Sequence, residues 1–108
     1  MMAKTSLITS LQKIVNPIYL KYINEYNFYI FGSILYKKEP NDIDLLIVYD
    51  QTKVDITEVI RLKHKLIRAI NKTIKKKIDV CTLSYSEASQ SNFIMEENCV
   101  ALFESVLK

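Results

Sequence analysis

The chain has 108 residues, which is the size of one small domain. Hydrophobic residues make up 49% of it and charged residues 25%, as is ordinary for a globular protein in water. The formal net charge of +3 is too mild to argue by itself for a nucleic-acid partner. Since no apolar run is long enough to cross a bilayer or to serve as a signal peptide, we expect a single cytoplasmic domain over residues 1–108.

The first expected element is an amphipathic helix. Apolar side chains recur at helical spacing over residues 7–22, and Thr5 or Ser6 can cap the start. Pro17 lies inside this pattern, so it either kinks one helix or begins a second helix that Asn16 caps. The pattern therefore predicts one or two helices before the first strand.

Two strands are expected next. Residues 27–31 are aromatic and β-branched, which is typical of a strand. Residues 42–49 form a near-continuous apolar run behind two aspartates, as in a strand that is covered on both faces. The only glycine of the chain, Gly32, and its neighbour Ser33 lie directly after the first of these strands.

A long helix and a third strand follow. Asp55 has the position of a cap, and apolar side chains recur at helical spacing from residue 56 to residue 74. The opposite side of this helix carries a basic stripe, which is either a solvated face or a docking surface for an acidic partner or RNA. The residues of the basic stripe are Arg61, Lys65, Arg68, Lys72 and Lys75. The apolar stretch 77–83 predicts the third strand, with Asp79 near its start.

The last expected elements are a helix and a short strand. Ser84 and Glu87 have the spacing of a capping box and predict a helix that runs to about residue 97. Asn98, which tolerates a left-handed conformation, ends it, and residues 100–103 are a candidate closing strand. Because helices and strands alternate, the sequence predicts an α/β fold with a small mixed sheet flanked by helices.

Aspartates at the starts of two strands carry the chemistry of this pattern. Side chains in a strand alternate, so Asp42 and Asp44 leave one face side by side. Their mutual repulsion and partial burial are costs that a divalent cation removes, and oxygen ligands suit Mg²⁺. If the third strand lies beside this one, Asp79 joins them, and three carboxylates can hold two metal ions for a phosphoryl displacement. The alternative is that each aspartate is a solvated residue at a turn or a strand end.

Gly32 and Ser33 fit a turn that binds phosphate. A glycine lets the backbone approach a ligand closely, backbone amides at a helix start attract phosphate, and a serine hydroxyl adds a donor. Taken alone, this dipeptide is explained as well by an ordinary turn between a strand and a helix. The acidic pair that follows at short range favours the phosphate turn.

These features together resemble a known family. The specific parts are "FGS", "NDIDLLIVY" and "IDVCTLS", followed by the ending "IMEENCVALFES". They are similar to the nucleotidyltransferase superfamily that includes DNA polymerase beta, and more narrowly to the minimal nucleotidyltransferases, which are often the antitoxins of toxin–antitoxin pairs. The resemblance covers roughly residues 27–104.

The resemblance implies a reaction and a set of site residues. It assigns Asp42, Asp44 and Asp79 to two magnesium ions, and Asp79 also to the activation of the attacking hydroxyl. It assigns Gly32 and Ser33 to the triphosphate. The implied reaction transfers a nucleoside monophosphate, AMP from MgATP, to a hydroxyl and releases pyrophosphate, while the metal ions neutralise charge on the phosphates.

The chain departs from the family after the Gly-Ser pair. The minimal enzymes commonly have a small residue, an arginine and a glycine there, whereas Tyr36 stands at the place of the arginine. That arginine helps to bind phosphates. Lys37 or Lys38 can supply a point charge instead, without the two-pronged donor of a guanidinium group.

The acceptor of the nucleotide is open at this level. A chain of this length leaves little room for a separate substrate domain, so we expect the acceptor on another molecule, and a toxin-like partner protein fits best. Transfer to a small molecule or a tRNA end is an alternative. Another is an idle binding module that neutralises its partner by contact; the intact carboxylates argue against this module and the missing arginine argues for it. The sequence leaves the nucleotide and the oligomeric state open.

Overall fold

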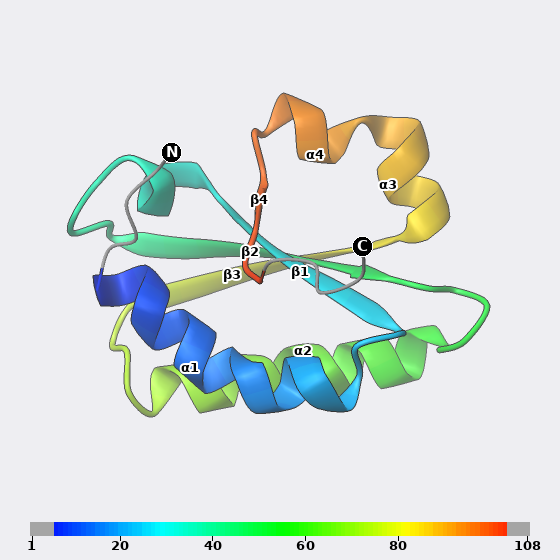
Figure 1. The fold of residues 1–108 in the computed structure, drawn as a ribbon, viewed down its shortest axis with the longest axis horizontal. Helices are drawn as coiled ribbons and strands as arrows, with labels where there is room; N and C mark the ends of the chain where they lie inside the picture. Colours follow the sequence, from blue (N-terminus) through cyan, green and yellow to red (C-terminus); the bar gives the residue numbers. More distant parts are fainter. Residues whose placement is uncertain (1–5, 104–108) are drawn as a thin grey trace.

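The computed structural model describes residues 6–103, which form a mixed four-stranded sheet with helices on both faces (Figure 1). The helical segments are α1 (Ser6–Lys21), the short 3-10 turn η1 (Gly32–Leu35), α2 (Ile56–Asn71), α3 (Tyr85–Ser91) and α4 (Phe93–Glu96). The strands are β1 (Tyr26–Phe31), β2 (Asp42–Tyr49), β3 (Lys77–Ser84) and β4 (Val100–Ala101). The predicted α/β class with a small mixed sheet is confirmed.

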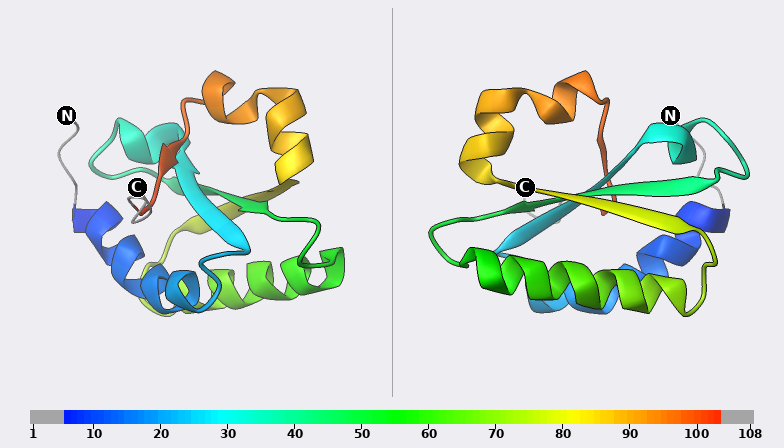
Figure 2. Two further views of the ribbon diagram at one scale, coloured as in Figure 1. Left: turned by 45° about the vertical axis from the view of Figure 1, so that its right-hand side comes forward. Right: turned by 180° about the vertical axis from the view of Figure 1, so that it is seen from behind.

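The strands lie in the order β3-β2-β1-β4. β1 pairs antiparallel with both β2 and β4, whereas β2 and β3 run parallel and are joined through α2. Figure 1 shows α1 and α2 on one face of the sheet and α3 and α4 on the other, and the two turned views in Figure 2 agree. We call these the closed face and the open face of the sheet.

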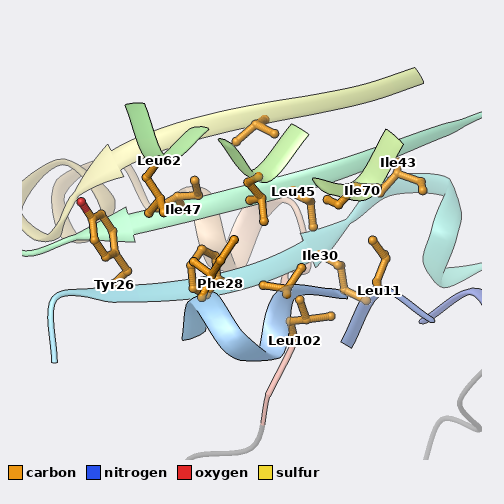
Figure 3. Packing of buried hydrophobic residues seen from close by; sticks show 14 of the residues in the cluster. Leu11, Tyr26, Phe28, Ile30, Ile43, Leu45, Ile47, Leu62, Ile70 and Leu102 are labelled. Atoms are coloured by element: carbon orange, nitrogen blue, oxygen red, sulfur yellow. The ribbon is translucent and has the colours of Figure 1, made fainter. Parts of the chain in front are cut away.

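The hydrophobic core lies between the closed face and the two long helices. Alternate residues of β1 and β2 point into it, and each meets the apolar side of α1 or α2 (Figure 3). The strand residues of this core include Tyr26, Phe28, Ile30, Ile43, Leu45 and Ile47. Leu46 and Val48 are also buried, although they point to the other face. β2 is therefore covered on both faces along its second half, as its apolar run predicts.

The two long helices follow their sequence signals closely. α1 is one helix that contains Pro17, which decides between the one-helix and two-helix predictions; Thr5 lies outside the described residues. α2 begins after Asp55, whose carboxylate accepts from the backbone N–H of Glu58 in a capping box. The helix ends at Asn71, short of the predicted residue 74. Lys75 therefore lies beyond the helix, so the basic stripe on α2 is shorter than its spacing predicts.

The predicted last helix is wrong as a single element. The capping box of Ser84 and Glu87 is present, but the helix ends at Ser91 and a second short helix begins at Phe93. Asn92 between them is left-handed, with φ 56°. The break turns Phe93 edge-on to Phe31 of β1, with ring centroids 5.4 Å apart.

The end of the chain returns to the sheet. Asn98 is left-handed at φ 53°, as predicted, and it directs the chain into β4. β4 covers only two of the four residues predicted, because the pairing with β1 is limited to Tyr29 and Ile30. Within residues 6–103, none of the helices combines the length and the apolar character needed to cross a membrane.

Candidate active site

The candidate site lies at the edge of the open face where β1 ends and β2 and β3 begin. Asp44 is paired across the sheet with Phe31 of β1 on one side and with Asp79 of β3 on the other. Residues that are paired in this way point to the same face of a sheet. Asp42 is two residues before Asp44 and shares that face, and its partner on β3 is Lys77. The parallel pairing of β2 and β3 thus meets the condition for the three aspartates to lie near one another, because it places Asp79 beside Asp44.

Gly32 lies against the carboxylate of Asp44. Its backbone has φ +79°, a conformation that side chains disfavour, and a Cβ at this position would collide with the Asp44 Oδ2 atom. Glycine is therefore favoured at position 32 for two reasons: the positive φ of its backbone, and the Asp44 carboxylate that occupies the place of a side chain. The Gly-Ser turn and Asp44 of the acidic pair, which are separated in sequence, therefore lie against each other.

The electrostatics of the site centre on Asp44, which is half-buried. Burial raises the pKa of its carboxyl above the ordinary value of 3.8, and the charges of Asp79 and Asp42 raise this pKa further. The ammonium of Lys77 acts on the same pKa in the opposite direction. The site therefore concentrates negative charge that a cation would stabilise.

The three aspartates fit a hard metal ion by their chemistry. Carboxylate oxygens are the ligands that Mg²⁺ takes in phosphoryl-transfer sites, and the repulsion at Asp44 is what a dication relieves. The three aspartates occupy adjacent positions of β2 and β3, but their carboxylates do not surround a single position where one metal ion could sit. Among residues 6–103, no three His, Cys, Asp or Glu side chains are arranged closely enough to hold one ion between them. Asp79 instead faces a cation of the chain itself: its Oδ1 atom is 3.9 Å from Nζ of Lys77.

The turn after β1 carries the other predicted site residues. Ser33 is half-buried in η1, and its carbonyl oxygen accepts from the backbone N–H groups of Tyr36 and Lys37 at 3.0 Å and 2.9 Å. The side chains of Tyr36 and Lys37 are exposed, in the segment that leads to β2. Glu39 in this segment is paired with Lys76, at 3.6 Å between Oε2 and Nζ, which ties the segment to the residue before β3.

Sequence reasoning missed Lys77 as a residue of the site. From the sequence it is only the first residue of the third expected strand, which covers residues 77–83. The signal that identifies it is the strand period, because the residue two positions before Asp79 must point to the same face. Lys77 is thus the one basic side chain that the β2–β3 pairing places directly beside the predicted metal ligands.

Two carboxylates on one strand face, a third on the neighbouring strand and a glycine turn against Asp44 form the arrangement expected of proteins that bind and transfer nucleotides. The family model described as polymerase beta, nucleotidyltransferase matches residues 13–104, and the chain belongs to this family. Nucleotidyltransferases of this family generally use a nucleoside triphosphate and a divalent metal ion. A search of curated proteins finds none that matches the chain.

Proposed function

We propose that this nucleotidyltransferase transfers AMP from ATP to a hydroxyl group of a partner protein, and that it acts as the antitoxin of a toxin–antitoxin pair. The observation that supports the nucleotide chemistry is the contact of the Gly32 turn with Asp44, which is itself paired with Asp79. A triphosphate bound along the turn would have its phosphates next to Asp44, the carboxylate that links the turn to Asp79. Family membership over residues 13–104 supports the same reaction class.

The proposed reaction is an in-line displacement at the α-phosphorus. The acceptor oxygen forms a bond to the α-phosphorus, the bond from that phosphorus to the α–β bridging oxygen breaks, and pyrophosphate leaves. Asp79 accepts the proton of the attacking hydroxyl. Asp42, Asp44 and Asp79 would hold the Mg²⁺ ions, which neutralise charge on the phosphates when bound. Gly32 and Ser33 position the triphosphate, and Lys37 is a candidate for an added phosphate contact.

The site leaves room for a large acceptor. The side chain of Asp79 is 45% exposed, and it lies on the edge strand of the sheet. α3 begins at the far end of β3 from Asp79. An acceptor carried by another macromolecule can therefore approach the proposed base from solvent.

The basic stripe on α2 faces away from this site. Arg61, Lys65 and Arg68 are exposed, while the apolar side of α2 packs on the closed face. A partner that docked only on this stripe would lie across the sheet from the carboxylates. If the stripe binds the partner, the partner must also reach around the sheet edge to be modified, or else a second surface presents the acceptor.

The second candidate is a binding module that neutralises its partner by contact alone. The specific observation in its favour is Tyr36, which is 74% exposed at the position where related enzymes commonly carry a phosphate-binding arginine. Contact alone requires none of the three aspartates. A substitution at Asp79 therefore separates the two candidates: it should abolish the action of a nucleotidyltransferase on its partner, and it should leave a binding module fully effective.

The test uses the protein encoded next to this chain as the acceptor. Wild type and Asp79→Asn are each incubated with that protein, labelled ATP and Mg²⁺, and the acceptor is weighed by mass spectrometry. The proposal expects one added AMP with wild type, and a loss of transfer by several orders of magnitude with Asp79→Asn while ATP still binds.

A matched control is Glu87→Gln, since this carboxylate caps α3 and lies at the far end of β3 from the site. Its transfer rate should equal that of wild type. Full neutralisation of the partner by Asp79→Asn, with no mass change even from wild type, would support the binding module instead. Label found on tRNA or a small molecule would redirect the proposal to those acceptors.

A further inference from the structure

Lys77 is placed among the carboxylates by the backbone and not by chance contact of a long side chain. It is the first residue of β3, and its Cα is paired with that of Asp42 across the parallel ladder. Its side chain points to the same face as Asp42, Asp44 and Asp79. Its Nζ atom is 3.9 Å from Oδ1 of Asp79, and its charge also acts on Asp44.

Two other lysines near the site have partners outside it. Nζ of Lys75 donates to the backbone oxygen of Asn71, and Lys76 is paired with Glu39. Lys37 is exposed in the segment after η1. Lys77 alone among these four combines a ladder position beside the aspartates with an ion pair to one of them.

We propose that Lys77 is a built-in cation of this site: in the free protein its ammonium offsets part of the negative charge of the carboxylates, and when metal and triphosphate bind it turns to the phosphates. The inference rests on the proposed function, because it assumes that a metal ion takes the carboxylates. It gives Lys77 two roles of opposite sign, as a competitor of the metal and as a binder of the nucleotide.

The competition follows from simple electrostatics. A lysine ammonium and a divalent ion are attracted to the same oxygen atoms, and a dication that displaces the ammonium must first break the pair with Asp79. Exposed pairs of this kind contribute up to about 1 kcal/mol, which corresponds to a change of roughly fivefold in metal affinity. The pair is loose at 3.9 Å, and the Lys77 side chain is 70% exposed, so the ammonium is free to move.

The second role compensates for the arginine that the turn lacks. Once the carboxylates hold metal, the ammonium is left beside a triphosphate that approaches along Gly32 and Asp44. A flexible side chain with a compact charge can follow the phosphate oxygens, which makes lysine a common phosphate ligand. Lys77 thereby supplies from β3 the positive charge that Tyr36 does not supply from the turn.

The experiment measures two affinities in Lys77→Gln. Binding of Mn²⁺ alone is followed by calorimetry, and binding of a non-hydrolysable ATP analogue is followed in saturating Mn²⁺. We expect Mn²⁺ alone to bind about fivefold more tightly than in wild type, and the analogue to bind roughly tenfold more weakly. Lys77→Arg should restore analogue binding, because it retains the charge. Lys72→Gln, at the C-terminal end of α2, is the control for loss of one exposed charge.

The outcomes separate this inference from the proposed function. Wild type that binds metal and analogue, with both affinities in Lys77→Gln equal to those of the Lys72→Gln control, overturns the role of Lys77 and leaves the proposed function intact. The same holds if Lys37→Gln alone weakens the analogue. Wild type that binds neither metal nor analogue overturns both. An unchanged melting temperature in Lys77→Gln shows that the affinities are those of a folded protein.

Discussion

The two faces of β2 differ sharply at the start of the strand, although their residues alternate along a single chain. Leu45 on the closed face is buried among the apolar side chains of the core (Figure 3). Asp44, one position earlier, lies on the open face among charges and next to solvent. Leu45 thus contributes to stability and Asp44 to the candidate site. A substitution at one of them should therefore change stability without changing ligand binding, or the reverse.

The difference comes from how the helices cover the sheet. α1 and α2 run along the closed face, whereas α3 and α4 occupy the open face only in part (Figures 1 and 2). Leu46 on the open face is fully buried, and Asp44, two residues before it, is only half-buried. The part of the open face that is covered by protein therefore ends between Leu46 and Asp44. Carboxylates at such an edge are close to low-dielectric protein and still reachable by a ligand.

The strongest test of the comparison is Asp44→Asn. We expect nucleotide transfer to fall by several orders of magnitude, because a neutral amide binds a divalent ion poorly. We expect the protein to remain folded, with a melting temperature equal to or above that of wild type, since the repulsion from Asp42 and Asp79 is relieved. Transfer is measured with labelled ATP, and stability by thermal unfolding without metal. A large loss of stability would show that the two faces are not separable.

Leu45→Ala is the matched change on the closed face. Truncation of a buried leucine leaves a cavity and should lower the free energy of unfolding by about 2–5 kcal/mol. At a temperature where the variant is still folded, its affinity for metal should match that of wild type, because the Asp44 side chain leaves the other side of the strand. Urea unfolding and metal titration test the two statements, and a weaker metal site in folded Leu45→Ala would contradict the separation.

Gly32→Ala tests the contact between the turn and the acidic pair. The positive φ should cost about 1–2 kcal/mol of stability, and the collision with the Asp44 carboxylate should add to it and disturb triphosphate binding. The same substitution made in an Asp44→Ala background should cost less, since the colliding group is absent. Urea unfolding of the four proteins in this double-mutant cycle measures the coupling, and equal costs in both backgrounds would show that the contact is not important.

A smaller effect is expected at Tyr26, a titratable residue of the closed face. Burial, followed by the charge of Glu58, raises the pKa of its hydroxyl to about 12, from 10.0. The unfolded chain therefore releases this proton first as pH rises, so stability is lost between about pH 10 and pH 12, by on the order of 1–2 kcal/mol. The free energy of unfolding of Tyr26→Phe should depend less on pH over that window. Identical pH profiles would show that this hydroxyl is not protected by burial.

Several features of the molecule depend only on residues that are close in sequence, and these could be predicted from the sequence alone. The cap at Asp55 and the capping box at Ser84 depend on residues within one helical turn, and both are present. The shared face of Asp42 and Asp44 depends only on strand alternation. The resemblance carried by the "FGS" and "NDIDLLIVY" stretches led to the family that the match over residues 13–104 shows. The roles of Asp42, Asp44, Asp79, Gly32, Ser33 and Lys37 in catalysis and binding remain predictions.

Contacts between distant segments were decided by the tertiary structure. Asp79 could be placed beside Asp44 only once β3 paired in parallel with β2. The need for glycine at position 32 comes from a carboxylate twelve residues away, which no local pattern records. The break at Asn92 turns Phe93 onto Phe31 of β1, so that packing against the sheet overrides the helical pattern. Lys77 joins the site for the same physical reason: local sequence sets which way a side chain points, but strand pairing sets what it meets.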